Sequence, residues 1–227
     1  MVNKVDFDDY ADNYNELLAE NTQFFSDDEE YFSRYKVELV AAQSKGSFKR
    51  VLEYGCGIGR NIPALRSAFP EADVVGSDIS EASLEVARKN NPDVEFFIEG
   101  DDCIEHELFD LIFVAGVFHH IPLDRRAEAA ALLAQRLAVN GCLYVFEHNP
   151  YNPVTRHIVN TCIYDEDAIL LKPKTLRELL NNAGLQVLEH AYCLFIPPRF
   201  KKLIAIEKYF EWLPLGGQYW LRSTRAK

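Results

Sequence analysis

A short apolar segment that runs into a glycine-rich loop is the feature that most constrains how this chain can fold. Residues 51–54 are apolar enough for a strand, and residues 60–69 have the pattern of a helix. Three glycines lie between them: Gly55, Gly57 and Gly59. Glycine lets the backbone turn sharply and approach a ligand closely, and the start of a helix offers unpaired N–H groups. The loop therefore predicts a nucleotide-type binding site between a strand and a helix.

The stretch from residue 50 to 148 alternates between strand-like and helical segments. The expected strands are 51–54, 73–77, 94–98, 110–115 and 141–147. This alternation implies right-handed crossovers and a parallel sheet. Two more strands, 186–196 and 218–224, flank an insert at about 197–217 and fit an antiparallel addition. We therefore expect an α/β fold, a Rossmann-like doubly wound sheet that is mainly parallel, with an antiparallel C-terminal edge strand and helices on both faces.

An acid at the end of the second expected strand narrows the choice of cofactor. Asp78 lies 19 residues after Gly59, and a carboxylate there can accept hydrogen bonds from ribose hydroxyls. Dinucleotide-binding loops need a third glycine at position 60, where this chain has Arg60. Glu53 places an acid just before the loop, which suits a ligand with an ammonium and a sulfonium better than a pyrophosphate. The pattern favours a sulfonium cofactor over a dinucleotide.

The run Glu53-x-Gly55-x-Gly57-x-Gly59 resembles the first motif of class I S-adenosylmethionine-dependent methyltransferases. Segments 74–80, 99–103 and 109–121 resemble the second, third and fourth motifs, so the likeness covers about residues 48–148. Within this family the chain is most similar to the type 11/12 small-molecule group, and the segment 147–171 resembles a loop of that group. The resemblance implies S-adenosyl-L-methionine as cofactor, an N-terminal helical lid at 1–46 and a methyltransferase domain at 47–227.

The resemblance also implies which residues contact the cofactor. They are Glu53, Gly55, Cys56, Gly57, Asp78, Ile79, Asp101, Asp102, Cys103 and Ala115. The Asp78 carboxylate is expected to bind ribose and Ile79 to pack on adenine. Either Asp101 or Asp102 would take the adenine amino group, with Asp101 favoured. In the lid, Tyr10 and Tyr14 offer ring faces to a sulfonium, although the same spacing is also that of ordinary core packing.

Two adjacent histidines follow the fourth expected strand, at the sheet edge where ligands bind in such folds. In the family, the pattern V-x-x-H-[IV] places a histidine beside the methionine end of the cofactor, and here that histidine is His120. We expect His120 to be the catalytic base, with a structural role as the alternative. Glu147 and His148 follow the fifth strand and form either a second acid–base pair or a buried hydrogen-bond network. No H-x-x-x-H pair or carboxylate cluster is present, so no metal is expected.

Charge and composition exclude several classes of protein. The net charge of -11 argues against nucleic-acid binding, and no apolar run is long enough for an integral membrane segment. Five cysteines without a C-x-x-C pair, behind a polar N-terminus, predict reduced thiols and a cytoplasmic location. The N/D-P-P-Y/F signature of amino-group methyltransferases is absent, which disfavours DNA and protein-amine substrates.

The sequence therefore predicts a methyltransferase acting on a small molecule or a glycan-type precursor, at oxygen. Carbon or nitrogen methylation by the same fold remains an alternative. So does a non-catalytic cofactor-binding protein, whereas a nicotinamide-dependent oxidoreductase is disfavoured by Arg60 and Glu53.

Overall fold

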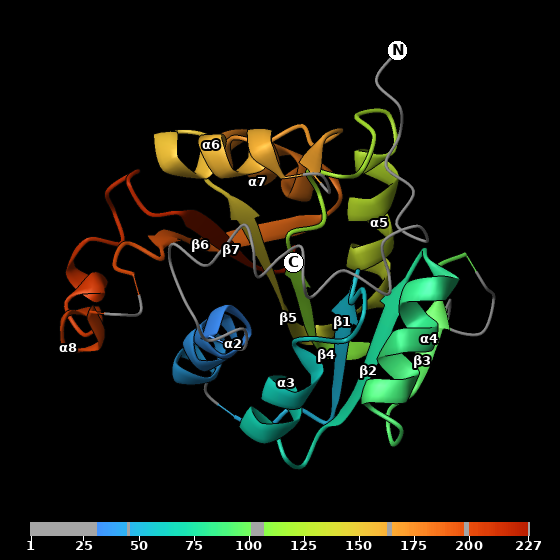
Figure 1. Cartoon of the computed structure of the whole chain (residues 1–227). Helices are drawn as coiled ribbons and strands as arrows, with labels where there is room; N and C mark the ends of the chain where they lie inside the picture. The colour runs from blue at the N-terminus through green and yellow to red at the C-terminus, as the bar shows by residue number, and fades with distance from the viewer. Residues whose placement is uncertain (1–30, 45, 101–106, 163–164, 198–199, 227) are drawn as a thin grey trace.

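The computed structural model describes residues 31–44, 46–100, 107–162, 165–197 and 200–226, which form one seven-stranded sheet flanked by helices (Figure 1). The strands are β1 (Arg50–Tyr54), β2 (Asp73–Asp78), β3 (Phe96–Ile98), β4 (Phe109–Ala115), β5 (Leu137–His148), β6 (Leu185–Cys193) and β7 (Gln218–Arg225). The helices are α2 (Tyr31–Gln43), α3 (Ile62–Ala68), α4 (Glu81–Asn90), α5 (Arg126–Arg136), α6 (Pro153–Thr161), α7 (Pro173–Asn182) and α8 (Lys201–Ile204), with a 3-10 turn at Glu207–Tyr209.

The strand order β3-β2-β1-β4-β5-β7-β6 confirms the expected fold class. Strands β1 to β5 pair in parallel, and β7 pairs antiparallel with both β5 and β6. The expected antiparallel C-terminal strand is thus β7, which lies one place in from the edge formed by β6. The order reverses between β1 and β4, and in such sheets this is where ligands bind.

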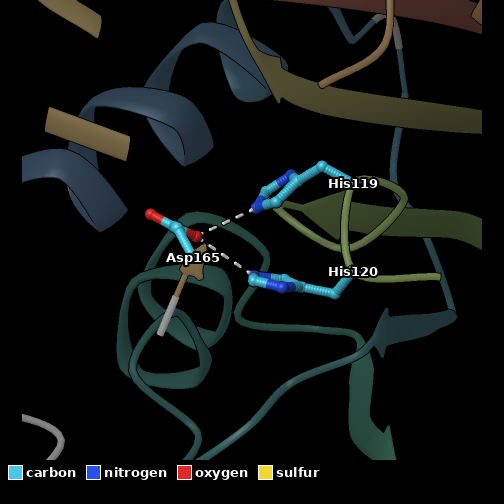
Figure 2. A group of neighbouring side chains, drawn as sticks. All are labelled: His119, His120 and Asp165. Carbon is cyan, nitrogen blue, oxygen red and sulfur yellow. Dashed lines mark ion pairs between the residues drawn. The ribbon is translucent and has the colours of Figure 1, made fainter. Parts of the chain in front are cut away.

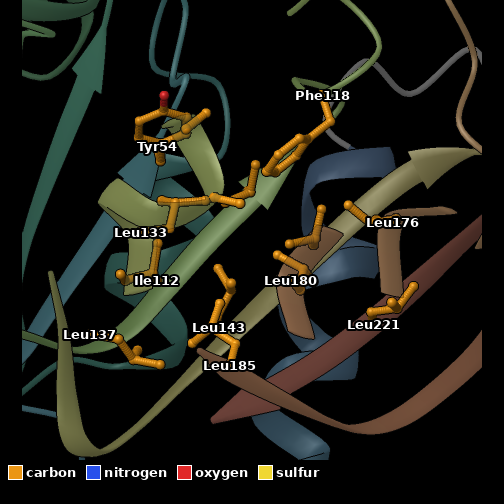
Figure 3. Close-up of a cluster of buried hydrophobic side chains, with 14 of the residues drawn as sticks. Tyr54, Ile112, Phe118, Leu133, Leu137, Leu143, Leu176, Leu180, Leu185 and Leu221 are labelled. Atoms are coloured by element: carbon orange, nitrogen blue, oxygen red, sulfur yellow. The ribbon is translucent and has the colours of Figure 1, made fainter. Parts of the chain in front are cut away.

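Strand β4 shows why helices cover both faces of the sheet. Its central residues are fully buried, and successive side chains point to opposite faces. Ile112 and Val114 join the cluster in Figure 3, which is completed by residues of α5 and α7 such as Leu133 and Leu180. Leu111 and Phe113 join a second cluster with residues of α2, α3 and α4. A strand that is buried on both faces needs an unbroken apolar sequence. Residues 111–115 of β4 have such a sequence.

The sequence expectation misses one helix and shifts some boundaries. The segment 147–171, expected as a loop, contains α6. The side chain of Asn152 accepts hydrogen bonds from the N–H groups of Val154 and Thr155, and Pro153 occupies the first turn, so the helix has an ordinary start. Strand β5 begins at Leu137, four residues earlier than expected, because α5 already ends at Arg136.

The structure describes part of the expected lid, residues 1–46, and most of the expected insert, residues 197–217. Most of the expected lid, including Tyr10 and Tyr14, lies outside the described residues. Helix α2 is described, and its Val37 and Val40 are buried in the core beneath the sheet. The expected insert joins β6 to β7 and carries α8 and the 3-10 turn. Over the described ranges, none of the helices combines the length and the apolar character needed to cross a bilayer.

Candidate active site

A cavity of about 620 Å³ opens at the carboxyl ends of β1, β2, β3 and β4. This volume lies within the usual range for small-molecule sites. Seven of the residues predicted from the sequence line it: Gly55, Cys56, Gly57, Asp78, Ile79, Ala115 and His120. The glycine loop and the histidine loop, which are about sixty residues apart in the sequence, therefore border one cavity.

The glycine loop is held in place by the end of β2. Both Gly55 and Gly57 have positive φ, at 69° and 52°, a conformation that side-chain-bearing residues rarely adopt. The backbone N–H of Gly55 donates to the carbonyl of Ser77 at 2.8 Å, and that of Gly57 donates to Asp78 Oδ2 at 2.8 Å. Asp78 Oδ1 accepts from the N–H of Ser80 at 3.0 Å. The loop and the acid predicted from the sequence thus form one hydrogen-bonded unit.

The Asp78 carboxylate has the free lone pairs that a ribose-binding acid needs. Burial raises its pKa, and the N–H donors of Ser80 and Gly57 oppose that rise. The carboxylate accepts backbone hydrogen bonds from Gly57, Ser80 and Ile79, and its roughly four acceptor sites leave capacity for a ribose hydroxyl. Beside it, Ile79 lines the cavity with 62% of its surface exposed, an apolar face of the kind that a purine ring covers. The geometry fits the nucleoside part of S-adenosylmethionine.

Glu53 is buried and is not among the described residues that line the cavity. Its Oε1 accepts a hydrogen bond from Asn61 Nδ2 at 2.5 Å, and Asn61 does line the cavity. Its Oε2 has no hydrogen-bond partner among the described residues. Burial raises the pKa of Glu53 to about 8, opposed by the Asn61 hydrogen bond and by Lys36. A buried acceptor without a donor beside a cavity suits a ligand that carries an ammonium group, as S-adenosylmethionine does.

The expected adenine contacts fall partly outside the described residues. Asp101, Asp102 and Cys103 lie in the range 101–106, which the structure does not describe. The two residues before them, Glu99 and Gly100, line the cavity. Glu99 pairs with the buried Arg136 at 2.8 Å, so this carboxylate already has a cationic partner.

Several cavity residues were not predicted, and the clearest are basic. Lys36 comes from α2, Arg60 follows the glycine loop, and Arg125 precedes α5. Burial lowers the pKa of Lys36. In the sequence, Arg60 was noted only as a residue that breaks a dinucleotide motif. Nothing near Lys36 in the sequence marks it, because α2 and the glycine loop come to border one cavity only in the folded chain.

Glu147 anchors the loop that follows β4, whose residues Gly116 and Val117 line the cavity. Its Oε1 accepts from the backbone N–H groups of Val117 and Phe118 at 3.1 and 2.8 Å. Its Oε2 pairs with His119 Nδ1 at 2.6 Å. All three carboxylate contacts are buried or partly buried, and the side chain of Glu147 is fully buried. Of the two roles open to Glu147 from the sequence, the structure favours the buried hydrogen-bond network.

His119 and His120 are adjacent in sequence and differ in charge. Burial lowers the pKa of His119, but Glu147 and Asp165 outweigh burial and raise it to about 9. Burial and the neighbouring His119 lower the pKa of His120 to about 4. At neutral pH His119 is therefore a cation and His120 is a neutral imidazole on the cavity wall, which is the form that accepts a proton.

His148 lies beside His119, and it is not among the described residues that line the cavity. Its ring centroid lies 4.9 Å from that of His119, and burial and His119 lower its pKa to about 4. Asp165, which the sequence did not single out, reaches both histidines of the β4 loop (Figure 2). The segment after Asp165 is tied to this loop by Arg126, which donates to the carbonyls of Ile121 and Ile169 at 2.8 Å.

Comparisons with known proteins agree with this geometry. Residues 51–141 match the family model described as a methyltransferase domain. Trans-aconitate 2-methyltransferase of Acidovorax ebreus is 39% identical over 115 residues, which are 50% of this chain and 43% of that protein. Malonyl-[acyl-carrier protein] O-methyltransferase of Halalkalibacterium halodurans is 32% identical over 116 residues, 47% of this chain and 42% of that protein. The matched part thus spans less than half the length of these relatives.

Likeness in structure extends over almost the whole chain. A TehB-like SAM-dependent methyltransferase from Corynebacterium glutamicum superposes with a TM-score of 0.65 at 19% identity, covering 96% of this chain and 98% of that one. At this identity the comparison establishes the fold. The family match covers the glycine loop, Asp78 and His120, which are residues that border the cavity.

Proposed function

We propose that the chain is an S-adenosylmethionine-dependent methyltransferase that transfers a methyl group to an oxygen of a small molecule or glycan-type precursor. The match of residues 51–141 to a methyltransferase-domain model and the class I fold support this proposal. The observation that carries the proposal is the position of the His120 imidazole on the wall of the cavity that Gly57 and Asp78 also line. When bound, the cofactor would supply an electrophilic methyl group.

The residues of the chain would position the cofactor and remove the proton of the acceptor. Asp78 and the N–H groups of the glycine loop would position the nucleoside, and Glu53 would receive the ammonium group. Much of the acceleration in methyl transfer comes from alignment and from exclusion of water. His120 would take the proton of an acceptor hydroxyl as the oxygen attacks, which is a task for a neutral histidine.

The names of the relatives support a small acceptor. One names trans-aconitate, and the other names an O-methylation of a malonyl group on a carrier protein. Basic residues on the cavity wall, such as Lys36 and Arg125, are compatible with an acceptor that carries negative charge.

The test is transfer of a labelled methyl group from S-adenosylmethionine to a panel of hydroxylated metabolites, nucleotide sugars, carboxylic acids and amines. We expect a product methylated at oxygen, identified by NMR. Turnover in His120→Ala should fall roughly 10²- to 10⁴-fold, as for loss of a general base, while cofactor affinity stays near that of the unaltered chain. His157→Ala, which removes an exposed histidine of α6, is the matched control.

Two results would count against this proposal. Methylation only at carbon or nitrogen would exclude the oxygen assignment. Equal turnover in His120→Ala and His157→Ala would end the candidacy of His120.

A further inference from the structure

Three metal-type ligand atoms converge beside the cavity. Figure 2 shows the rings of His119 and His120 turned toward Asp165. The Nε2 atoms of His119 and His120 lie 3.5 and 3.4 Å from the same oxygen, Asp165 Oδ1. These separations exceed the usual 2.7–3.2 Å of an N–H···O hydrogen bond. They are close to the spacing of about 3.3–3.4 Å between ligands of a tetrahedral ion with bonds of about 2.0–2.1 Å, and the ligand atoms of all three residues lie within 4.8 Å of one another.

Each histidine also has a carboxylate near its other ring nitrogen. His119 Nδ1 is hydrogen-bonded to Glu147 Oε2 at 2.6 Å, whereas Asp167 Oδ1 lies 3.6 Å from His120 Nδ1, beyond hydrogen-bond distance. Metal-binding histidines usually have such a carboxylate or carbonyl partner, because it fixes the ring so that the opposite nitrogen faces the ion. In both histidines Nδ1 faces one carboxylate and Nε2 faces Asp165.

The cluster borders the cavity through His120. His120 lines the cavity, and the side chains of His120 and Asp165 are 16% and 11% exposed, whereas that of His119 is 1% exposed. Three protein ligands with an open side are typical of a catalytic metal site, in which a water or substrate atom completes the coordination. Two imidazoles with one carboxylate suit first-row transition ions such as Zn²⁺ or Fe²⁺ better than Mg²⁺, which prefers oxygen ligands.

We propose that His119, His120 and Asp165 bind one divalent transition-metal ion, and that this ion holds an oxygen of the methyl acceptor. The second half of this proposal rests on the proposed function, while the metal site itself does not. The sequence predicted no metal, because the two histidines are adjacent and Asp165 lies beyond β5 and α6.

A bound ion changes how His120 acts on the acceptor. The Nε2 lone pair of His120 would then go to the ion. A Lewis-acidic ion lowers the pKa of a hydroxyl that it binds, so the acceptor hydroxyl would lose its proton to a solvent water, and His120 would assist through the ion and not by taking the proton directly.

Binding of Zn²⁺ and Co²⁺ to metal-free protein tests the site, with protein that has no histidine purification tag. Calorimetry should give one Zn²⁺ per chain. Co²⁺ should give visible absorption bands of nitrogen and oxygen coordination, without the charge-transfer band of a thiolate. Asp165→Asn should weaken Zn²⁺ binding by at least about tenfold, and Asp167→Asn should weaken it by a smaller factor, because it removes a nearby negative charge but no ligand.

The controls are His157→Ala and Asp93→Asn, which alter exposed residues away from the cluster and should bind Zn²⁺ like the unaltered chain. Equal Zn²⁺ affinity in Asp165→Asn and Asp93→Asn would overturn the site, as would a thiolate band with Co²⁺. If Asp165→Asn does not fold by circular dichroism, the Co²⁺ spectrum of the unaltered chain and the Asp167→Asn affinity decide the matter.

Activity separates the two halves of the proposal. Methyl transfer that is lost with EDTA and restored by Zn²⁺ or Fe²⁺ supports an acceptor held by the ion. Full transfer in EDTA removes that role and leaves the proposed function standing. Zn²⁺ binding at the cluster without response to S-adenosylmethionine in calorimetry would remove the proposed function and leave the metal site.

Discussion

The two ends of the cavity are built in different ways. At the end proposed for the cofactor, called the cofactor end below, backbone N–H groups of the glycine loop meet the carboxylate of Asp78, and both lie where neighbouring parallel strands end. At the end proposed for the acceptor, called the acceptor end below, side chains from three distant segments meet: the loop after β4, the end of β5 and the segment that begins at Asp165. A site made from backbone at strand ends is visible in local sequence. A site made from side chains depends on how distant segments pack.

Because the acceptor end is built from side chains, we expect its stability to depend most on the buried carboxylate of Glu147. Replacing Glu147 by Gln removes a negative charge from beside His119, which is itself a buried cation. Loss of one partner of a buried ion pair costs about 3–5 kcal/mol. We expect urea denaturation to show a loss of unfolding free energy in that range.

Glu178→Gln is the matched control, because Glu178 is exposed on α7 and its ion pair with Lys174 is long, at 3.8 Å. Exposed pairs of this kind add little to stability. If Glu147→Gln were as stable as Glu178→Gln, the carboxylate would not be the anchor of the β4 loop.

At the cofactor end, a side chain at Gly55 should cost more stability than its positive φ alone explains. A Cβ on Gly55 would lie 2.5 Å from Val117 Cγ2, and φ is +69°, so Gly55→Ala adds a clash to backbone strain. Gly184→Ala is the matched control, since φ is +86° there and a Cβ meets nothing within 4 Å. Strain of this type costs about 1 kcal/mol.

We therefore expect Gly184→Ala to lose about 1 kcal/mol and Gly55→Ala to lose more, together with cofactor affinity. Thermal melts and calorimetry measure the two effects. Adding Val117→Ala should recover the excess loss in Gly55→Ala. No recovery in the double variant would show that the clash with Val117 is not what excludes a side chain at position 55.

The smallest expected effect is a pH dependence that belongs to the acceptor end. The pKa of His119 is raised from 6.5 to about 9 in the folded chain. Its contribution to stability is then complete below pH 6.5, the unfolded value, and is lost as the pH rises toward 9. In metal-free protein we expect the melting temperature to fall over this window, and to fall less in His119→Asn than in His157→Asn. Parallel slopes for these two variants would contradict a charged His119.

The two ends also differ in how well the sequence predicted them. The alternation of strands and helices defined the parallel part of the sheet, because a buried strand such as β4 must be apolar on both faces. The glycine loop and Asp78 were found together because their spacing follows from one strand–helix–strand unit. Helix α6 was missed because its proline- and asparagine-rich start resembles a loop when its cap is not seen.

The acceptor end was less predictable for a physical reason. Glu147 was recognised as an acid at a strand end, but its partners are N–H groups about thirty residues earlier in the chain. Asp165 was missed because its relation to His119 and His120 appears only when the segment after α6 folds back over the sheet. No periodicity or short motif encodes such a contact.

The central claim is that the cavity at the ends of β1 and β2 binds S-adenosylmethionine through the glycine loop and Asp78. Calorimetry with S-adenosylmethionine, S-adenosylhomocysteine and NAD tests it, using Asp78→Ala and the control Asp73→Ala, an exposed acid on the same strand. We predict one site for each sulfur ligand and none for NAD. Loss of a charged hydrogen-bond acceptor should weaken binding in Asp78→Ala by at least about tenfold, with no change in Asp73→Ala. Tight NAD binding without response to either sulfur ligand, or equal affinity in the two variants, would contradict the account.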